Sequence, residues 1–141
     1  MKNHIKYIVL FSILFNFIWE MAQMPFYLNM PWNLRTTIIC LAASLGDAVM
    51  ILIIYFLVLL FLKDSFWIRK LRLKGVMFSI IWGFVLSVLV EWIAVANNLW
   101  QYSNFMPLLP FGEIGITPVL QMLVLPLIVF KLTEIIIYLR S

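Results

Sequence analysis

The chain is poor in charged residues, in cysteine and in histidine, and these shortages exclude several classes of protein. Only 11% of its 141 residues are charged, whereas 65% are hydrophobic. A soluble domain carries charge on about a quarter of its residues, so a soluble fold of this composition would expose apolar surface that it could not bury. We therefore expect an integral membrane protein, with a single transmembrane domain over residues 1–141.

The lone cysteine and the lone histidine limit the available chemistry further. Cys40 cannot form an internal disulfide, and His4 alone cannot provide the paired axial ligands of a haem. The ten Lys and Arg residues form no basic face, so no nucleic-acid partner is expected. The sequence predicts neither a metal site nor a cofactor. We expect Cys40 to be a small core residue and His4 to lie on the surface.

Four apolar runs are long enough to cross a bilayer, which takes about 20 residues each. They cover residues 7–24, 36–62, 76–96 and 118–138, and they predict an all-α, four-helix membrane bundle. Nine of the ten Lys and Arg residues lie near the two termini or in the loop at 63–75, and only Arg35 lies in the other connections. By the positive-inside rule, both termini are cytoplasmic. The predicted location is the bacterial inner membrane, with several spans.

Polar residues recur at spacings of three and four in three of these runs, so each set occupies one helix face. The sets are Ser12, Asn16, Glu20 and Gln23; Thr37, Cys40, Ser44 and Asp47; and Ser79, Gly83, Ser87 and Glu91. The small residues of the third set should permit a neighbouring helix to approach closely. Most of the hydroxyl and amide side chains are typical of interhelical hydrogen bonding, whereas carboxyl groups are costly in lipid.

The three carboxyl groups are predicted to lie at one depth. A rise of ~1.5 Å per residue places Glu20, Asp47 and Glu91 ~21–26 Å from the cytoplasmic flank, in the outer half of a core ~30 Å thick. Gln121 falls near the same level. Because an isolated ionised carboxylate in hydrocarbon is costly, these acids should face a polar pocket and share a proton. We take Glu20, Asp47 and Glu91 as the candidate catalytic residues.

The stretch from 100 to 121 is unlike the rest of the chain, since it holds three of the six prolines and two of the five glycines. We expect most of it to form an outer lid over the pocket, with the fourth helix starting near Pro118 and Glu113 exposed to solvent. The candidate ligand-binding residues are Asn16, Gln23, Arg35, Trp100, Tyr102 and Gln121. Anchoring at the membrane interface is an equally good explanation for Trp100 and Tyr102.

Several motifs resemble those of a family of small four-span bacterial membrane proteins to which no activity is assigned. They are Trp19-Glu20-x-x-Gln23-x-Pro25, Gly46-Asp47, Glu91-Trp92, Trp100-x-Tyr102 and Gly115-x-x-Pro118-x-x-Gln121. The resemblance covers most of the chain and implies that the motif residues lie on the outer side. Trp100-x-Tyr102 with Gly115-Ile116-x-Pro118 is also similar to the end of membrane lycopene cyclase domains, which protonate an isoprenoid. Leu120 and Gln121 stand where those domains have acids.

Two classes of function remain open. The chain is either a membrane-embedded acid/base enzyme or binder acting on a lipid or isoprenoid-like molecule, or a small transporter or channel component for a proton, cation or small solute. Transport would favour a homo-oligomer, because four spans enclose little room. A non-catalytic accessory subunit is a third possibility. Membrane lipids are the predicted partners, and a blind pocket would favour the enzyme or binder.

Overall fold

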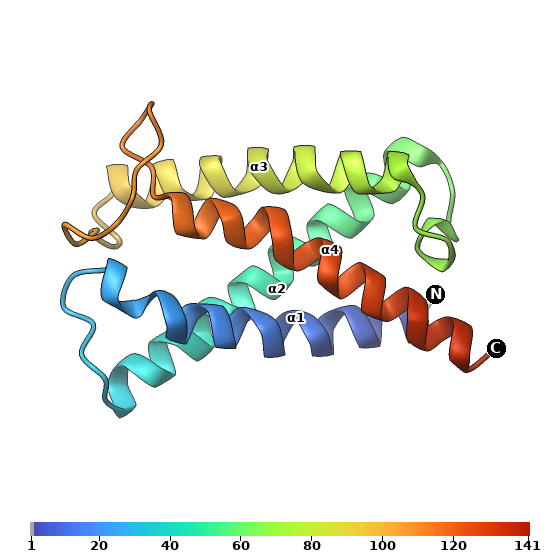
Figure 1. Cartoon of the computed structure of the whole chain (residues 1–141), viewed down its shortest axis with the longest axis horizontal. Coiled ribbons are helices and arrows are strands. Elements are labelled where there is room, and N and C mark those ends of the chain that lie inside the picture. The colour runs from blue at the N-terminus through green and yellow to red at the C-terminus, as the bar shows by residue number, and fades with distance from the viewer. Residues whose placement is uncertain (1) are drawn as a thin grey trace.

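The computed structural model describes residues 2–141 and consists of four long helices and two short 3-10 turns (Figure 1). The long helices are α1 (Lys2–Gln23), α2 (Leu34–Leu62), α3 (Leu73–Ala96) and α4 (Ile116–Leu139); the short ones are η1 (Met24–Phe26) and η2 (Trp67–Arg69). All four long helices are long and apolar enough to cross a membrane. No β-strand occurs in the described residues beyond two isolated bridges. The predicted all-α class is confirmed.

Each helix begins two to five residues before the apolar run that predicted it. At α2, the Asn33 side chain accepts a hydrogen bond from Thr36 N at 3.0 Å, and Thr36 Oγ1 accepts one from Asn33 N at 3.2 Å. This reciprocal capping box satisfies two backbone donors that would otherwise lack partners. At α4, Pro118 lies within the first turn, where its missing N–H costs nothing.

Figure 1 shows how the helices are arranged. Both chain ends lie at one end of the bundle, which we call the terminal end, and the connections 24–33 and 97–115 lie at the opposite end, which we call the distal end. Helix α2 runs obliquely. It packs along α1 and reaches α3 toward the terminal end, whereas α4 packs between α1 and α3.

The hydrophobic core fills the terminal half of the bundle. It joins α1, α2 and α4 to η2, and its buried aromatic centre is Tyr55, Trp67 and Phe130. The Trp67 and Phe130 rings meet edge to face at a centroid distance of 5.2 Å. The other core members are Ile8, Ile51, Ile54, Val58, Ile68, Met122, Leu125 and Val129. No polar side chain of the predicted site belongs to this cluster.

The inward faces of α1 and α3 confirm the predicted polar stripes, with one correction at the start of α1. Ser12 and Asn16 on α1 are fully buried, and Glu91 on α3 is only 5% exposed. Cys40 on α2 is 1% exposed, as expected of a small core residue. The expectation that His4 lies on the surface is wrong, since only 3% of this residue is exposed. The helix starts at Lys2, not at Tyr7. His4 therefore continues the buried face of Ile8 and Ser12 at spacings of four.

Helices α3 and α4 approach each other closely at Gly83. A Cβ atom on Gly83 would stand 2.2 Å from the carbonyl oxygen of Met122. This oxygen has no intrahelical partner, because the residue four positions later is Pro126, which has no N–H. The Cα–H of Gly83 therefore contacts a carbonyl that helix α4 itself leaves free, a weak interaction that is useful where water is absent.

The Gly83→Ala variant should lose about 1–3 kcal/mol of unfolding free energy, because the added methyl collides with backbone rather than with a flexible side chain. Gly46→Ala is the matched control, since nothing lies within 4 Å of its added Cβ. Reversible unfolding of both variants in mixed micelles measures the difference. Equal stability of the two variants would contradict the close approach.

Candidate functional site

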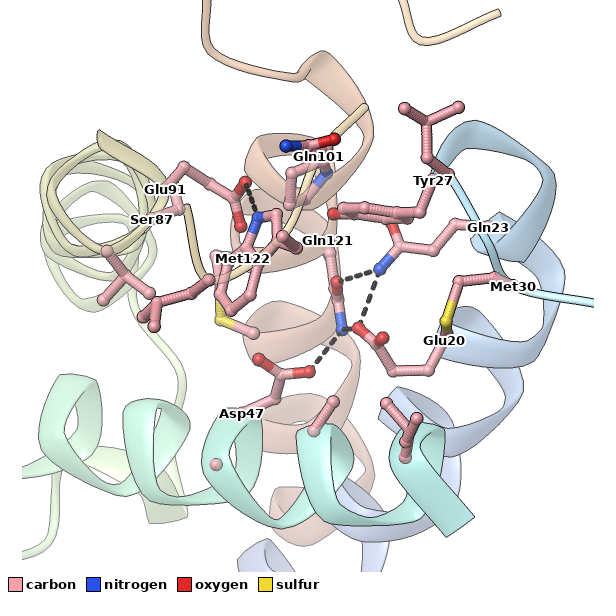
Figure 2. A pocket seen from close by; sticks show the side chains of 18 of the residues that line it. Glu20, Gln23, Tyr27, Met30, Asp47, Ser87, Glu91, Gln101, Gln121 and Met122 are labelled. Carbon is pink, nitrogen blue, oxygen red and sulfur yellow. Dashed lines mark hydrogen bonds between the residues drawn. The ribbon is translucent and has the colours of Figure 1, made fainter. Parts of the chain in front are cut away.

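A cavity of about 620 Å³ lies in the distal half of the bundle, between all four helices and beneath the two connections (Figure 2). The three candidate acids all line it, from three different helices: Glu20 from α1, Asp47 from α2 and Glu91 from α3. Gln121 of α4 completes the polar wall. The structure thus brings the predicted acids and the predicted amide to one pocket.

The amide of Gln121 is the centre of a hydrogen-bond network that joins α1, α2 and α4. Its Nε2 donates to Asn16 Oδ1 at 2.8 Å and to Asp47 Oδ2 at 2.8 Å, and lies 3.2 Å from Glu20 Oε1. Its Oε1 accepts from Gln23 Nε2 at 3.3 Å. Gln121 is only 2% exposed, so each of these bonds forms away from bulk water, where an unpaired amide is costly.

Gln23 closes the network on the α1 side. Its Nε2 donates to Glu20 Oε1 at 2.7 Å, and its Oε1 accepts from the indole N–H of Trp19 at 3.2 Å. The carboxyl groups of Glu20 and Asp47 both contact Gln121 Nε2, at 3.2 Å and 2.8 Å.

Glu91 is held apart from this pair, by side chains of the 97–115 connection. Its Oε2 accepts hydrogen bonds from the Tyr102 hydroxyl and, at 3.2 Å, from the Trp100 indole N–H. Burial raises the pKa of the Tyr102 phenol, and the bond to Glu91 raises it further. Tyr102 therefore remains a hydrogen-bond donor, and Glu91 is fixed as an acceptor.

Backbone pairing between the two distal connections positions Trp100 and Tyr102. Leu28 N donates to Gln101 O at 3.0 Å, and Ser103 N donates to Phe26 O at 2.8 Å. These bonds flank an antiparallel bridge between Tyr27 and Tyr102, whose rings lie 5.6 Å apart. The stretch expected to form a lid is thus attached to the connection between α1 and α2.

The predicted ligand-binding residues divide into two groups. The cavity is lined by Gln23, Arg35, Trp100 and Gln121. Asn16 and Tyr102 do not line it, but each bonds to a residue that does, Asn16 to Gln121 and Tyr102 to Glu91. Glu113 is exposed, as predicted, at the tip of a hairpin closed by the bridge between Leu108 and Gly115. In the described residues, no group of three His, Cys, Asp or Glu side chains is arranged to hold a metal ion.

Sequence reasoning missed Tyr27 and the apolar part of the wall. Tyr27 lines the cavity, and burial, with the charge of Glu91 as the next cause, raises the pKa of its phenol. The apolar wall is formed by Ile39, Ala43, Met50, Val90, Leu99, Pro118 and Met122, among others. On α2, residues 39, 43, 46, 47 and 50 share one face, so the helical spacing around Asp47 could have identified them.

None of the family models, curated proteins or solved structures compared with the chain matches it. The site is a cavity with one wall of hydrogen-bonded acids and amides and other walls of aliphatic and aromatic side chains. Its size is within the range of about 300–1,000 Å³ that is typical of small-molecule sites.

Replacing Gln121 should weaken the whole bundle. In Gln121→Leu, Asn16 Oδ1 and the Asp47 carboxyl lose their shared donor, and each unsatisfied buried group costs about 1–3 kcal/mol. Gln101→Leu makes the same chemical change at an exposed lining residue and should cost less than about 0.5 kcal/mol. Unfolding in mixed micelles distinguishes the two. A Gln121→Leu protein as stable as Gln101→Leu would disprove the network's role.

Proposed function

We propose that the chain is a multi-pass protein of the bacterial inner membrane with both termini on the cytoplasmic side. The support is the charge distribution. Eight of the ten Lys and Arg residues lie at the terminal end. They are found in the first turns of α1, between α2 and the start of α3, and at the end of the chain. Lys131 lies two turns before the end of α4. Arg35 alone lies at the distal end. The pocket then lies in the outer half of the bilayer.

We further propose that the pocket binds a lipid or isoprenoid-like molecule. The observation that carries this proposal is the mixed wall, in which the Gln121 network faces side chains such as Ile39, Met50 and Val90 across one cavity. A polar headgroup or a double bond can meet the acids while the apolar part of the ligand contacts the aliphatic wall. Arg35 at the distal end offers a cation for an anionic headgroup.

The Glu20–Asp47 pair is the proposed general acid and base. The protonated carboxyl donates its proton to a carbon or oxygen of the ligand, and the partner carboxylate removes a proton from a neighbouring atom of the ligand. Transfer of that proton between the two carboxyl groups then regenerates the pair. Gln121 orients both carboxyl groups through the same amide nitrogen. Glu91, held by Tyr102 and Trp100, supplies negative charge for a cationic intermediate on the other side of the pocket.

The core beneath the pocket favours this proposal over transport. Below Asp47, the inward residues of α2 are Ile51, Ile54 and Tyr55, each fully buried. They pack against Leu125 and Val129 of α4. A solute would have to cross this densely packed layer to reach the terminal end.

The proposal predicts a bound lipid whose amount depends on the acids. Lipids that copurify with the protein should include one class in excess over the host membrane. Asp47→Asn and Glu20→Gln should reduce that class about tenfold, since loss of a hydrogen bond to a charged group, about 1.5–3 kcal/mol, corresponds to this factor or more. Mass spectrometry of the extracted lipids measures the ratio. Glu113→Gln, at the exposed hairpin tip, is the matched control and should leave it unchanged.

The acid/base step is tested with the same preparations in deuterated water. The purified protein is incubated with a total lipid extract of the host membrane, and proton exchange at carbon makes one lipid class heavier. The wild type should produce the heavier lipid, whereas Asp47→Asn should not. If lipid is retained but no deuterium is incorporated, the chain is a binder and not an enzyme. Unchanged lipid content in both acid variants would overturn the pocket proposal itself.

A further inference from the structure

A second cavity, of about 370 Å³, lies at the terminal end, outside the site described above. It is enclosed by the last turn of α2, by η2 and by the first turns of α3. Its lining residues are Phe61, Leu62, Asp64, Trp67, Lys70, Arg72, Lys74, Gly75 and Phe78. Residues from the ends of two helices and the loop between them therefore form one hollow.

The charge in this cavity is strongly positive. Lys70, Arg72 and Lys74 line it, and Asp64 is its only acid. Asp64 already accepts a hydrogen bond from Phe66 N at 2.9 Å through Oδ1. Throughout residues 2–141, the one ion pair found joins Lys131 and Glu134, so none of the three cations has an acidic partner there.

Two arginines at this end lie over aromatic rings, unlike the three cations in the cavity. Arg69 lies over the ring of Phe66 at 4.5 Å, and Arg140 lies over the ring of Tyr7 at 5.4 Å. Lys70, Arg72 and Lys74 have no comparable aromatic contact among the described residues. The start of α3 adds to their charge, because no side chain caps its first turn and a helix N-terminus carries partial positive charge.

The remaining wall of the cavity is apolar and continues onto the outer face of the bundle. Phe61 and Phe78 stack at a centroid distance of 5.6 Å, and Phe61 is 52% exposed. Gly75 lets α3 lie against the indole of Trp67, since a Cβ there would come within 3.1 Å of the ring. The cavity thus places three cations directly beside aromatic surface that faces the lipid tails.

We propose that this cavity binds the phosphate group of an anionic phospholipid. The three cations and the helix N-terminus meet the phosphate, and the acyl chains lie along Phe61 and Phe78. Basic pockets between membrane helices on the cytoplasmic side recognise lipid headgroups through this combination of charge and apolar surface. The site is independent of the distal pocket, and neither proposal requires the other.

The test uses the full chain in nanodiscs that contain phosphatidylcholine with a minor fraction of phosphatidylglycerol, followed by native mass spectrometry of the released protein. The wild type should retain phosphatidylglycerol in preference to phosphatidylcholine. Arg72→Gln combined with Lys74→Gln should lower that retention at least tenfold, because each cation near an anionic lipid contributes a factor of about five. The Tm of this variant should be unchanged, since both side chains are exposed.

The matched control is Lys6→Gln combined with Arg140→Gln, which removes the same charge at the same end but outside the cavity. It should keep the preference for phosphatidylglycerol. Equal loss in the control, or no preference in the wild type, would overturn the proposal. It would also fail if inorganic phosphate bound with the same dependence on Arg72 and Lys74 while phosphatidylglycerol did not, since the site would then recognise a free anion.

Discussion

The hydrogen-bond network of one buried amide organises the distal half of this protein. Gln121 of α4 bonds to Asn16 of α1 and Asp47 of α2 through the same nitrogen and accepts from Gln23. In a low-dielectric interior such bonds are stronger than in water, and leaving them unmade is correspondingly costly. The network therefore holds three helices together and, with the same atoms, positions two carboxyl groups at the wall of a cavity.

The terminal half is held by a different kind of interaction. Tyr55, Trp67 and Phe130 form a buried aromatic centre, and Gly83 brings α3 against the carbonyl that Pro126 leaves free on α4. This tightly packed layer closes the pocket from below. The bundle thus combines a distal half that is hollow and polar with an aromatic and aliphatic core beneath it.

Much of this architecture could be predicted from local sequence patterns. The four helices and their buried polar faces follow from apolar length and from spacings of three and four, which are properties of single segments. The common level of Glu20, Asp47 and Glu91 follows from helix rise alone, and all three line one cavity. Helix starts were less predictable, because caps such as Asn33 and the polar turn around His4 extend the helices beyond the apolar runs.

The grouping of the acids could not be predicted from the sequence. Asp47 and Glu20 both contact the amide of Gln121, while Glu91 accepts from Tyr102, and this depends on the oblique course of α2 and on the pairing of Leu28 with Gln101. Both are long-range features that no single segment specifies. The roles of Asn16 and Tyr102, which hold lining side chains without lining the cavity themselves, depend on the same packing.

We propose that the pocket opens at the outer side of the membrane and ends above the core. Thiol labelling of spheroplasts with a membrane-impermeant reagent tests it, in a Cys40→Ser background that carries either Ala43→Cys or Ile51→Cys. Ala43 lines the pocket, whereas Ile51 lies about 12 Å further along α2, in the core. We expect rapid labelling from outside at position 43 and none at position 51. Equal labelling at both positions, or none at position 43, would contradict it.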